Sequence, residues 1–185
     1  LLRLREPATP ARIYTDNFAC SKVSHHPIPT MEFKPEDHNC HVLVWSHVLV
    51  KGAQAGSFLG AASTAPSLAL QAYRSGASAL TLQGAVSMAR GRAGAGLAYG
   101  LAATSVLGAA KVLSMDTDGA QDRAYRLHYN EGQNRCDRFW AAAAVAGGVV
   151  GAVTGAGPVW ILNSAALGGV LGVLAHVAVP FSKEE

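Results

Sequence analysis

Charged residues are scarce in this chain of 185 residues, at 15% of the sequence, whereas soluble proteins have about 25%. Aromatic residues are also few, at 7%, while 20 residues are glycine and 50% of the chain is hydrophobic. A net charge of +3 is too small for a nucleic-acid-binding protein, which needs a clustered basic face. Three cysteines are too few for a disulfide-rich scaffold. The composition indicates one domain with a core of small residues, and it argues against an ordinary soluble surface.

The few charges are concentrated in two parts of the chain. Residues 1–40 hold ten of them together with five of the eight prolines, and residues 111–138 hold another ten. The three longest segments without a charged residue are 52–73, 93–110 and 139–181. This segregation predicts apolar segments that cross a membrane, separated by polar segments that do not.

The sequence therefore predicts an all-α fold, a four-helix transmembrane bundle. As a single helix, 139–181 would extend about 65 Å, roughly twice the thickness of the hydrocarbon core, and the turn-forming pair Gly157-Pro158 divides it. The four predicted spans are about 45–72, 93–113, 139–156 and 159–179. They make up a membrane domain over 41–180, which follows an extended, polar, Pro-rich arm over 1–40 and contains a charged loop over 114–138.

Lys51, Pro66 and the segment 75–89 depart from the simple pattern of four apolar spans. Lys51 would lie in the first turns of its span, where a long side chain can reach the interface, and Pro66 predicts a kink. The uncharged segment 75–89 has only 15 residues, so an interfacial or loop helix is favoured over a fifth crossing. The alternative to the membrane interpretation is a soluble helical protein rich in alanine and glycine. Against it, 139–181 lacks the polar face that a soluble helix needs.

Glycines recur at intervals of four in each predicted span. Residues four apart share one face of a helix, so a neighbouring backbone can approach closely there. Helix-packing roles, and no ligand-binding role, are predicted for Gly52, Gly56, Gly60, Gly96, Gly100, Gly108, Gly147, Gly151, Gly155, Gly168 and Gly172.

Candidate residues for chemistry are few. The sequence contains no identifiable Ser-His-Asp arrangement, phosphate-binding loop or carboxylate pair, so no catalytic or cofactor-binding residue is predicted. Ligand-type side chains occur at Cys20, His25, His26, His38, Cys40 and His41. Their irregular spacing differs from that of zinc sites, so a solvated or partner-bound arm is favoured over a metal site. His176 is the one ionisable residue well inside a span, and a structural role is favoured for it over a functional one.

Three places in the sequence carry a family resemblance. Asp37-His38-Asn39-Cys40-His41 precedes the first span, the pattern GxxxGxxxG follows at 52–60, and Arg135-Cys136-Asp137 leads to Gly147-xxx-Gly151 in the third span. Together with four short spans, these features resemble a mitochondrial family that comprises the inner-membrane preprotein translocase channels and the four-helix accessory subunit of respiratory complex I. Arg135 and Asp137 are two residues apart instead of the family's four, which favours the complex I subunit over the channels.

The resemblance implies a multi-pass protein of the mitochondrial inner membrane, with both termini and the loop 114–138 in the intermembrane space. Arg74, Arg90 and Arg92 then lie on the matrix side. The implied function is that of a non-catalytic accessory subunit that stabilises complex I, without a cofactor. Its partners would be other membrane subunits and membrane lipid, with no nucleic acid and no small-molecule substrate.

The sequence leaves three alternatives open. Family members can bridge corresponding loops with a disulfide, so Cys40 and Cys136 are either bonded or two free thiols. The loop residues Asp122, Arg123, Arg126, Arg135, Asp137 and Arg138 either contact a partner or are solvated. The second function class is a preprotein or metabolite translocation channel. It would need a polar or acidic face, for which the spans offer mainly Ser, Thr, Gln54 and His176.

Overall fold

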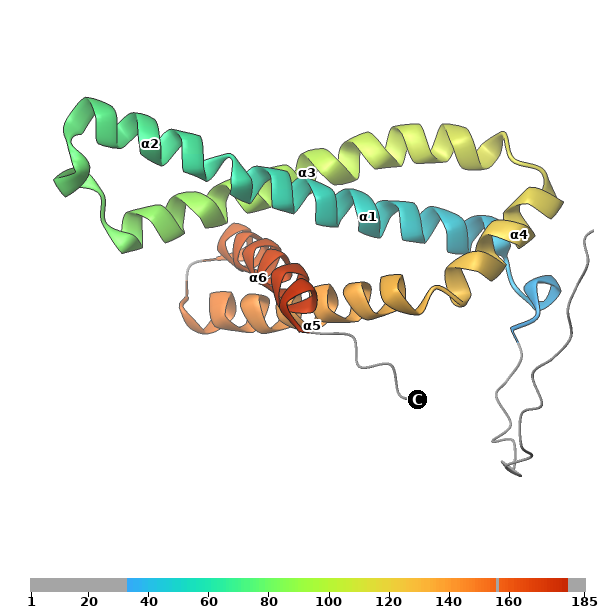
Figure 1. The fold of residues 1–185 in the computed structure, drawn as a ribbon. Helices are drawn as coiled ribbons and strands as arrows, with labels where there is room; N and C mark the ends of the chain where they lie inside the picture. The colour runs from blue at the N-terminus through green and yellow to red at the C-terminus, as the bar shows by residue number, and fades with distance from the viewer. Residues whose placement is uncertain (1–32, 156, 180–185) are drawn as a thin grey trace, which may run out of the picture. The chain divides into compact units, whose positions relative to one another are not determined.

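The computed structural model describes residues 33–155 and 157–179. In this part of the chain every regular element is helical, as the sequence predicts, and no strand occurs (Figure 1). The elements are η1 (Pro35–Asp37), α1 (Cys40–Ala62), α2 (Thr64–Ser75), η2 (Ala77–Ala79), α3 (Leu82–Leu113), α4 (Thr117–His128), α5 (Glu131–Val153) and α6 (Pro158–Ala178). Of the arm predicted over 1–40, residues 1–32 lie outside the described residues.

Short polar side chains set where most of the long helices begin. The side chains of Asn39, Thr81, Asp116 and Asn130 each accept a hydrogen bond, of 3.1–3.3 Å, from a backbone N–H in the first turn of the helix that follows. Such caps satisfy N–H groups that have no partner within the helix. α6 follows Gly157 instead, whose φ of 85° is readily adopted only by glycine, and begins at Pro158.

The first predicted span, 45–72, consists of two helices. α1 ends at Ala62 and α2 begins at Thr64, with Ser63 between them. Pro66 lies in the first turn of α2, where its ring nitrogen has no hydrogen to donate to the carbonyl of Ala62. The kink expected at Pro66 therefore takes the form of a break between two helices.

The second predicted span, 93–113, is part of a longer helix. α3 has 32 residues, and residues 82–89 form its first turns, so the segment 75–89 contains the short η2 and the start of α3 but no separate α-helix. The charged segment 114–138 is also mostly helical, since it contains α4 and the start of α5. The third and fourth predicted spans correspond to α5 and α6.

Three helices are long and apolar enough to cross a membrane, namely α3, α5 and α6. This finding is compatible with a multi-pass membrane protein. α1 has 23 residues but is not among the three. Its polar side chains, which include His47, Lys51 and Gln54, make it less apolar. The fourth crossing stays a prediction.

Glycines bring the backbones of α1 and α3 into contact. A Cβ atom on Gly56 would overlap the carbonyl oxygen of Gly96, and one on Gly96 would overlap that of Gly56. Gly100 approaches the carbonyl oxygen of Gly52 in the same way. Since the number on α1 falls by four as the number on α3 rises by four, the two helices run antiparallel.

α5 and α6 form a second antiparallel pair of the same kind. A Cβ atom on Gly147 would overlap the carbonyl oxygen of Ser164, and one on Gly168 would overlap that of Ala143. Added Cβ atoms would also lie within 3.0 Å of another helix at Gly60, Gly108, Gly151 and Gly172. Gly155 differs, because it follows the end of α5 with a φ of 76° and has no atom within 4 Å of an added Cβ. It is a turn residue and makes no helix contact.

Large apolar side chains on the outer faces of these helices stay exposed. In α5, only 6% of the most apolar 18-residue stretch is buried. The exposed set includes Tyr99, Val106 and Leu107 on α3, Val145, Val149, Val150 and Val153 on α5, and Leu162, Leu171, Leu174 and Val177 on α6. An apolar surface of this extent is suited to contact with lipid or with other apolar helices.

The glycine contacts lead to a test with a matched pair of variants on α3. Gly96→Ala places a methyl group against the backbone of α1, and we expect a loss of about 1–3 kcal/mol in unfolding free energy. Gly91→Ala meets no atom within 4 Å, so we expect a gain of up to about 1 kcal/mol from the better helix propensity of alanine. Denaturant titration in mild detergent, followed by circular dichroism, measures both. Equal effects of the two substitutions would contradict the close approach of α1 and α3.

Candidate functional site

Five polar side chains meet between α1 and α5. The α1–α5 polar cluster consists of His47, Lys51 and Gln54 from α1 and Gln133 and Asp137 from α5. The Lys51 ammonium donates to Asp137 Oδ1 and, at 2.9 Å, to Gln54 Oε1. Gln54 Nε2 also donates to Asp137 Oδ1, at 2.7 Å. Lysine, glutamine and aspartate thus form a closed triangle of hydrogen bonds.

Helical periodicity explains how the sequence builds this cluster. His47, Lys51 and Gln54 are separated by four and three residues, so they share one face of α1. Gln133 and Asp137 are four apart and share one face of α5. Each helix therefore presents a short polar stripe toward the other, and long side chains bridge the space between them.

His47 joins the cluster through contacts with Gln133 and Asp137 of α5. The side-chain amide of Gln133 contacts His47 Nε2, and because an amide nitrogen can only donate, Nε2 accepts. In the neutral ring the hydrogen is then on Nδ1, which faces Asp137 Oδ2 at 3.8 Å. That distance is too long for a hydrogen bond, so His47 adds a weak electrostatic contact to the carboxylate.

The charges of the cluster are balanced and partly shielded from solvent. The side chains of Lys51 and Asp137 are 33% and 23% exposed, and Gln54 is buried. The positive charge of Lys51 and the negative charge of Asp137 cancel each other. Gln54 forms a hydrogen bond with each of them. The cluster is therefore a contact between helices in which the one lysine and the one aspartate are paired with each other.

A cavity of about 380 Å³ adjoins the cluster. Its walls come from α1, α4 and α5 and are mostly apolar, with a few polar groups among them. The lining residues are Phe33, Leu43, Ser46, His47, Val50, Ala124, Leu127, His128, Asn134, Asp137, Trp140 and Ala141. The Phe33 ring closes one side by stacking on His128, with ring centroids 4.5 Å apart.

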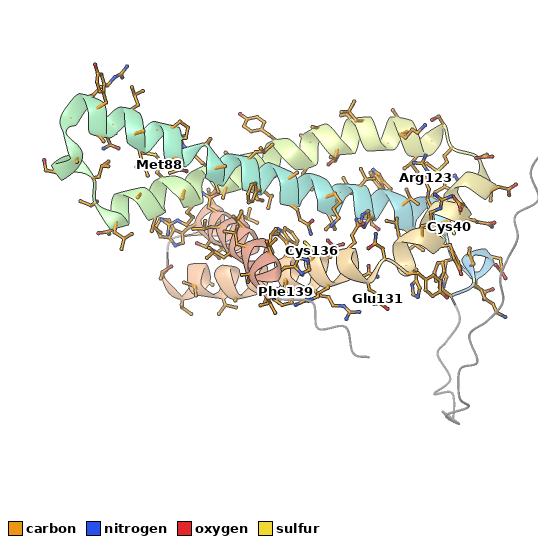
Figure 2. The ribbon with its side chains drawn as sticks, viewed as in Figure 1. Cys40, Met88, Arg123, Glu131, Cys136 and Phe139 are labelled. Atoms are coloured by element: carbon orange, nitrogen blue, oxygen red, sulfur yellow. The ribbon has the colours of Figure 1, made fainter. Side chains whose placement is uncertain are left out.

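The two candidate cysteines are free thiols in this structure and are not brought together. Cys40 lies at the start of α1 and Cys136 on α5, well apart in Figure 2. Cys40 is buried against Val44 and Val112, and its Sγ donates to the carbonyl oxygen of Pro35 at 3.2 Å. Cys136 is half-buried.

The candidate metal ligands do not converge in the described residues, where no three His, Cys, Asp or Glu side chains could share a metal ion. Cys20, His25 and His26 lie outside these residues. His38 stacks on Phe33 with ring centroids 5.0 Å apart, and His41 Nε2 lies 3.1 Å from the carbonyl oxygen of Met115.

His176, on α6, is half-buried and packs against α5. Its ring meets that of Phe139 edge-on, with centroids 5.7 Å apart. Its Nδ1 is buried and has no hydrogen-bond partner among the described residues.

Sequence reasoning missed the pairing of Lys51 with Asp137. It assigned Lys51 to the interface and Asp137 to a loop, although Asp137 is the seventh residue of α5. A signal was present in the sequence, since Lys51 has Gln54 three residues later and Asp137 has Gln133 four residues earlier. Two polar stripes on helical spacing, each next to an apolar run, would have predicted a contact between helices.

Residues 17–179 match the model of a protein family described as "Protein of unknown function (DUF1757)". The chain belongs to the DUF1757 family. The match covers every described helix, from α1 to α6. A comparison with curated proteins finds no match. The description of DUF1757 assigns no activity, so the α1–α5 polar cluster and the exposed apolar faces carry the functional argument.

The Lys51–Asp137 contact can be measured with a double-mutant cycle, using Lys51→Met and Asp137→Asn. Because both side chains are partly exposed, we expect a coupling energy of about 1–2 kcal/mol, below the cost of about 3–5 kcal/mol for breaking a fully buried pair. The control cycle uses Asp122→Asn and Arg126→Met, which remove an exposed pair on α4 with a distance of 2.8 Å. Its coupling should stay below about 0.5 kcal/mol. Equal coupling in both cycles would argue against a special role for the cluster.

The state of the cysteines can be read from alkylation followed by mass measurement, in a Cys20→Ser variant. Free thiols predict two alkyl groups after denaturation without reductant. In the native protein Cys136 should react before Cys40, whose thiol is buried. A protein that takes up alkyl groups only after reduction would instead have the disulfide that the family resemblance implies.

Proposed function

We propose that this DUF1757 chain is a non-catalytic accessory subunit of respiratory complex I in the mitochondrial inner membrane. In this proposal it stabilises the complex by bracing the membrane subunits around it. The family resemblance at 37–41, 52–60 and 135–151 suggests the complex. The observation that carries the structural role is the contrast between the two sides of the helices. Small residues hold the helices to one another, and large apolar residues point away from them.

The proposal makes α1 the fourth crossing, so that α1, α3, α5 and α6 form a four-helix bundle packed on glycines. A lysine inside a membrane is costly when it is alone, and less so when a carboxylate and a hydrogen-bond partner accompany it. Asp137 and Gln54 provide both partners for Lys51. The polar cluster thus supports a crossing that hydropathy alone does not favour.

Four crossings give a consistent orientation. With α1 antiparallel to α3 and α5 antiparallel to α6, the start of α1, helix α4 and the end of α6 belong to one side of the membrane. We assign this side to the intermembrane space, in line with the resemblance. The arm 1–40 and the segment 114–138 would then reach partner subunits there, and the outer faces of α3, α5 and α6 would contact membrane subunits and lipid.

The second candidate function is a channel for preproteins or metabolites. The observation that favours a channel is the cavity beside the α1–α5 polar cluster. A conducting path needs polar groups that are free to interact with the passing molecule. Here the charged members of the cluster bind each other, and the cavity is mostly apolar. We therefore rank the channel second.

Native gel electrophoresis of mitochondria solubilised in mild detergent tests the proposal. A tagged chain should comigrate with NADH dehydrogenase activity. Depletion of the chain should reduce the amount of assembled complex more than the activity of each remaining complex, because the chain holds no active site in this proposal. Gly91→Ala serves as the control variant and should assemble normally, whereas Gly96→Ala should assemble poorly. Migration in a separate, translocase-sized complex would favour the channel.

A further inference from the structure

Three arginines lie toward one end of the helices, and no carboxylate of the described residues pairs with them. Arg74 is in the last turn of α2, and Arg90 and Arg92 are in α3. The segments 51–115 and 139–179 contain no aspartate or glutamate. None of the ion pairs among the described residues involves these arginines. This arginine end, defined by Arg74, Arg90 and Arg92, is a local excess of positive charge.

Arg90 is held at the start of α6. Its guanidinium carbon lies 3.0 Å from the centroid of the Trp160 ring. The ring is fixed in turn, because Trp160 Nε1 donates to Thr154 Oγ1 at 2.9 Å, just after the end of α5. The guanidinium lies over the indole ring, and a guanidinium in contact with an aromatic ring can still bind an anion through its N–H groups.

Arg92 is held at the end of α1. Its Nη1 donates to the carbonyl oxygen of Ser63 and, at 3.3 Å, to the Ser63 hydroxyl. Arg90 and Arg92 are two residues apart, which separates them by about 3 Å along the helix axis but places them on opposite sides of α3. The two guanidinium groups therefore flank α3 at one level, where α1 ends and α6 begins.

Beyond this level, α2, η2 and the first turns of α3 carry exposed apolar side chains. Leu70 is 48% exposed, Tyr73 89% and Leu82 82%. In Figure 1 these segments form a hairpin at one end of the helices, with α2 leading into α3. Arginine combined with exposed apolar and aromatic residues is typical of elements that lie in the membrane interface.

We propose that the arginine end binds the phosphate headgroups of anionic phospholipids, through Arg90 and Arg92 at the membrane surface, with Trp160 at the same level. The positive charge, which no carboxylate of the described residues neutralises, matches anionic lipid, and a guanidinium can bind two phosphate oxygens at once. The hairpin beyond lies on the same surface and inserts its apolar side chains between the lipids. This inference rests on the membrane location in the proposed function and is independent of membership in complex I.

The test uses Trp160 as a reporter, because it contacts Arg90. The full chain with Trp45→Phe and Trp140→Phe is reconstituted into phosphatidylcholine vesicles that contain either brominated phosphatidylglycerol or brominated phosphatidylcholine at the same mole fraction. Bromine quenches tryptophan at short range, so the ratio of the two quenching efficiencies measures the local preference for the anionic lipid. We expect preferential quenching by phosphatidylglycerol that weakens at high salt.

Variants assign the preference to the arginines. Each Arg→Gln substitution at Arg90 or Arg92 should lower the preference about five-fold, the equivalent of about 1 kcal/mol for each basic residue near an anionic surface. Arg90→Lys with Arg92→Lys should keep most of it. Arg123→Gln on α4 is the control and should leave it unchanged. Circular dichroism verifies that each variant is folded.

Two results would overturn the inference, and they differ in meaning. Equal quenching by the two lipids, or a preference that survives the double Arg→Gln substitution, would refute the headgroup site alone. If neither lipid quenches Trp160, the membrane location fails as well. Comigration with NADH dehydrogenase activity is a separate measurement and is unaffected by either result.

Discussion

The arrangement depends on backbone contact between helices at glycine. In α1–α3 and in α5–α6, carbonyl oxygens of one helix occupy the space that a Cβ atom would fill on the other, as at Gly56 with Gly96 and at Gly168 with Ala143. Lipid gives apolar helices little reason to associate, so close van der Waals contact has to hold them together. Small residues therefore occupy the contacts between helices, and large apolar residues lie on the outer surface.

The α1–α5 polar cluster makes a different kind of contact. α1 contacts α5 through long side chains, where Lys51 and Gln54 meet Asp137. Glycine contacts tolerate almost no added volume, whereas the polar cluster specifies which charged residue faces which. The fold combines one device for close packing with another that selects a partner helix.

Sequence reasoning predicted the helical class and apolar segments close to α3, α5 and α6. These features follow from composition and from the turn at Gly157-Pro158, which are local. It did not predict the break at Ser63, the helix α4 or the contact between Lys51 and Asp137. These depend on which residues meet across 86 positions of sequence, or on caps such as Asp116, whose role is visible only once the neighbouring backbone is placed. Gly155 shows the same limit, since spacing alone cannot distinguish a packing glycine from a turn glycine.

The distance in sequence between Lys51 and Asp137 has a consequence for biosynthesis. α1 is made before α5, so Lys51 cannot meet Asp137 until α5 has been synthesised. α3 can pack on α1 earlier, through contacts that need only glycine. In the proposed four-crossing bundle, the nascent chain would therefore pass during membrane insertion through a stage in which α1 and α3 are paired but Lys51 still needs water, headgroups or an assembly factor. Completion of α5 ends that stage, so a helix that is made later determines when α1 can reach its final position.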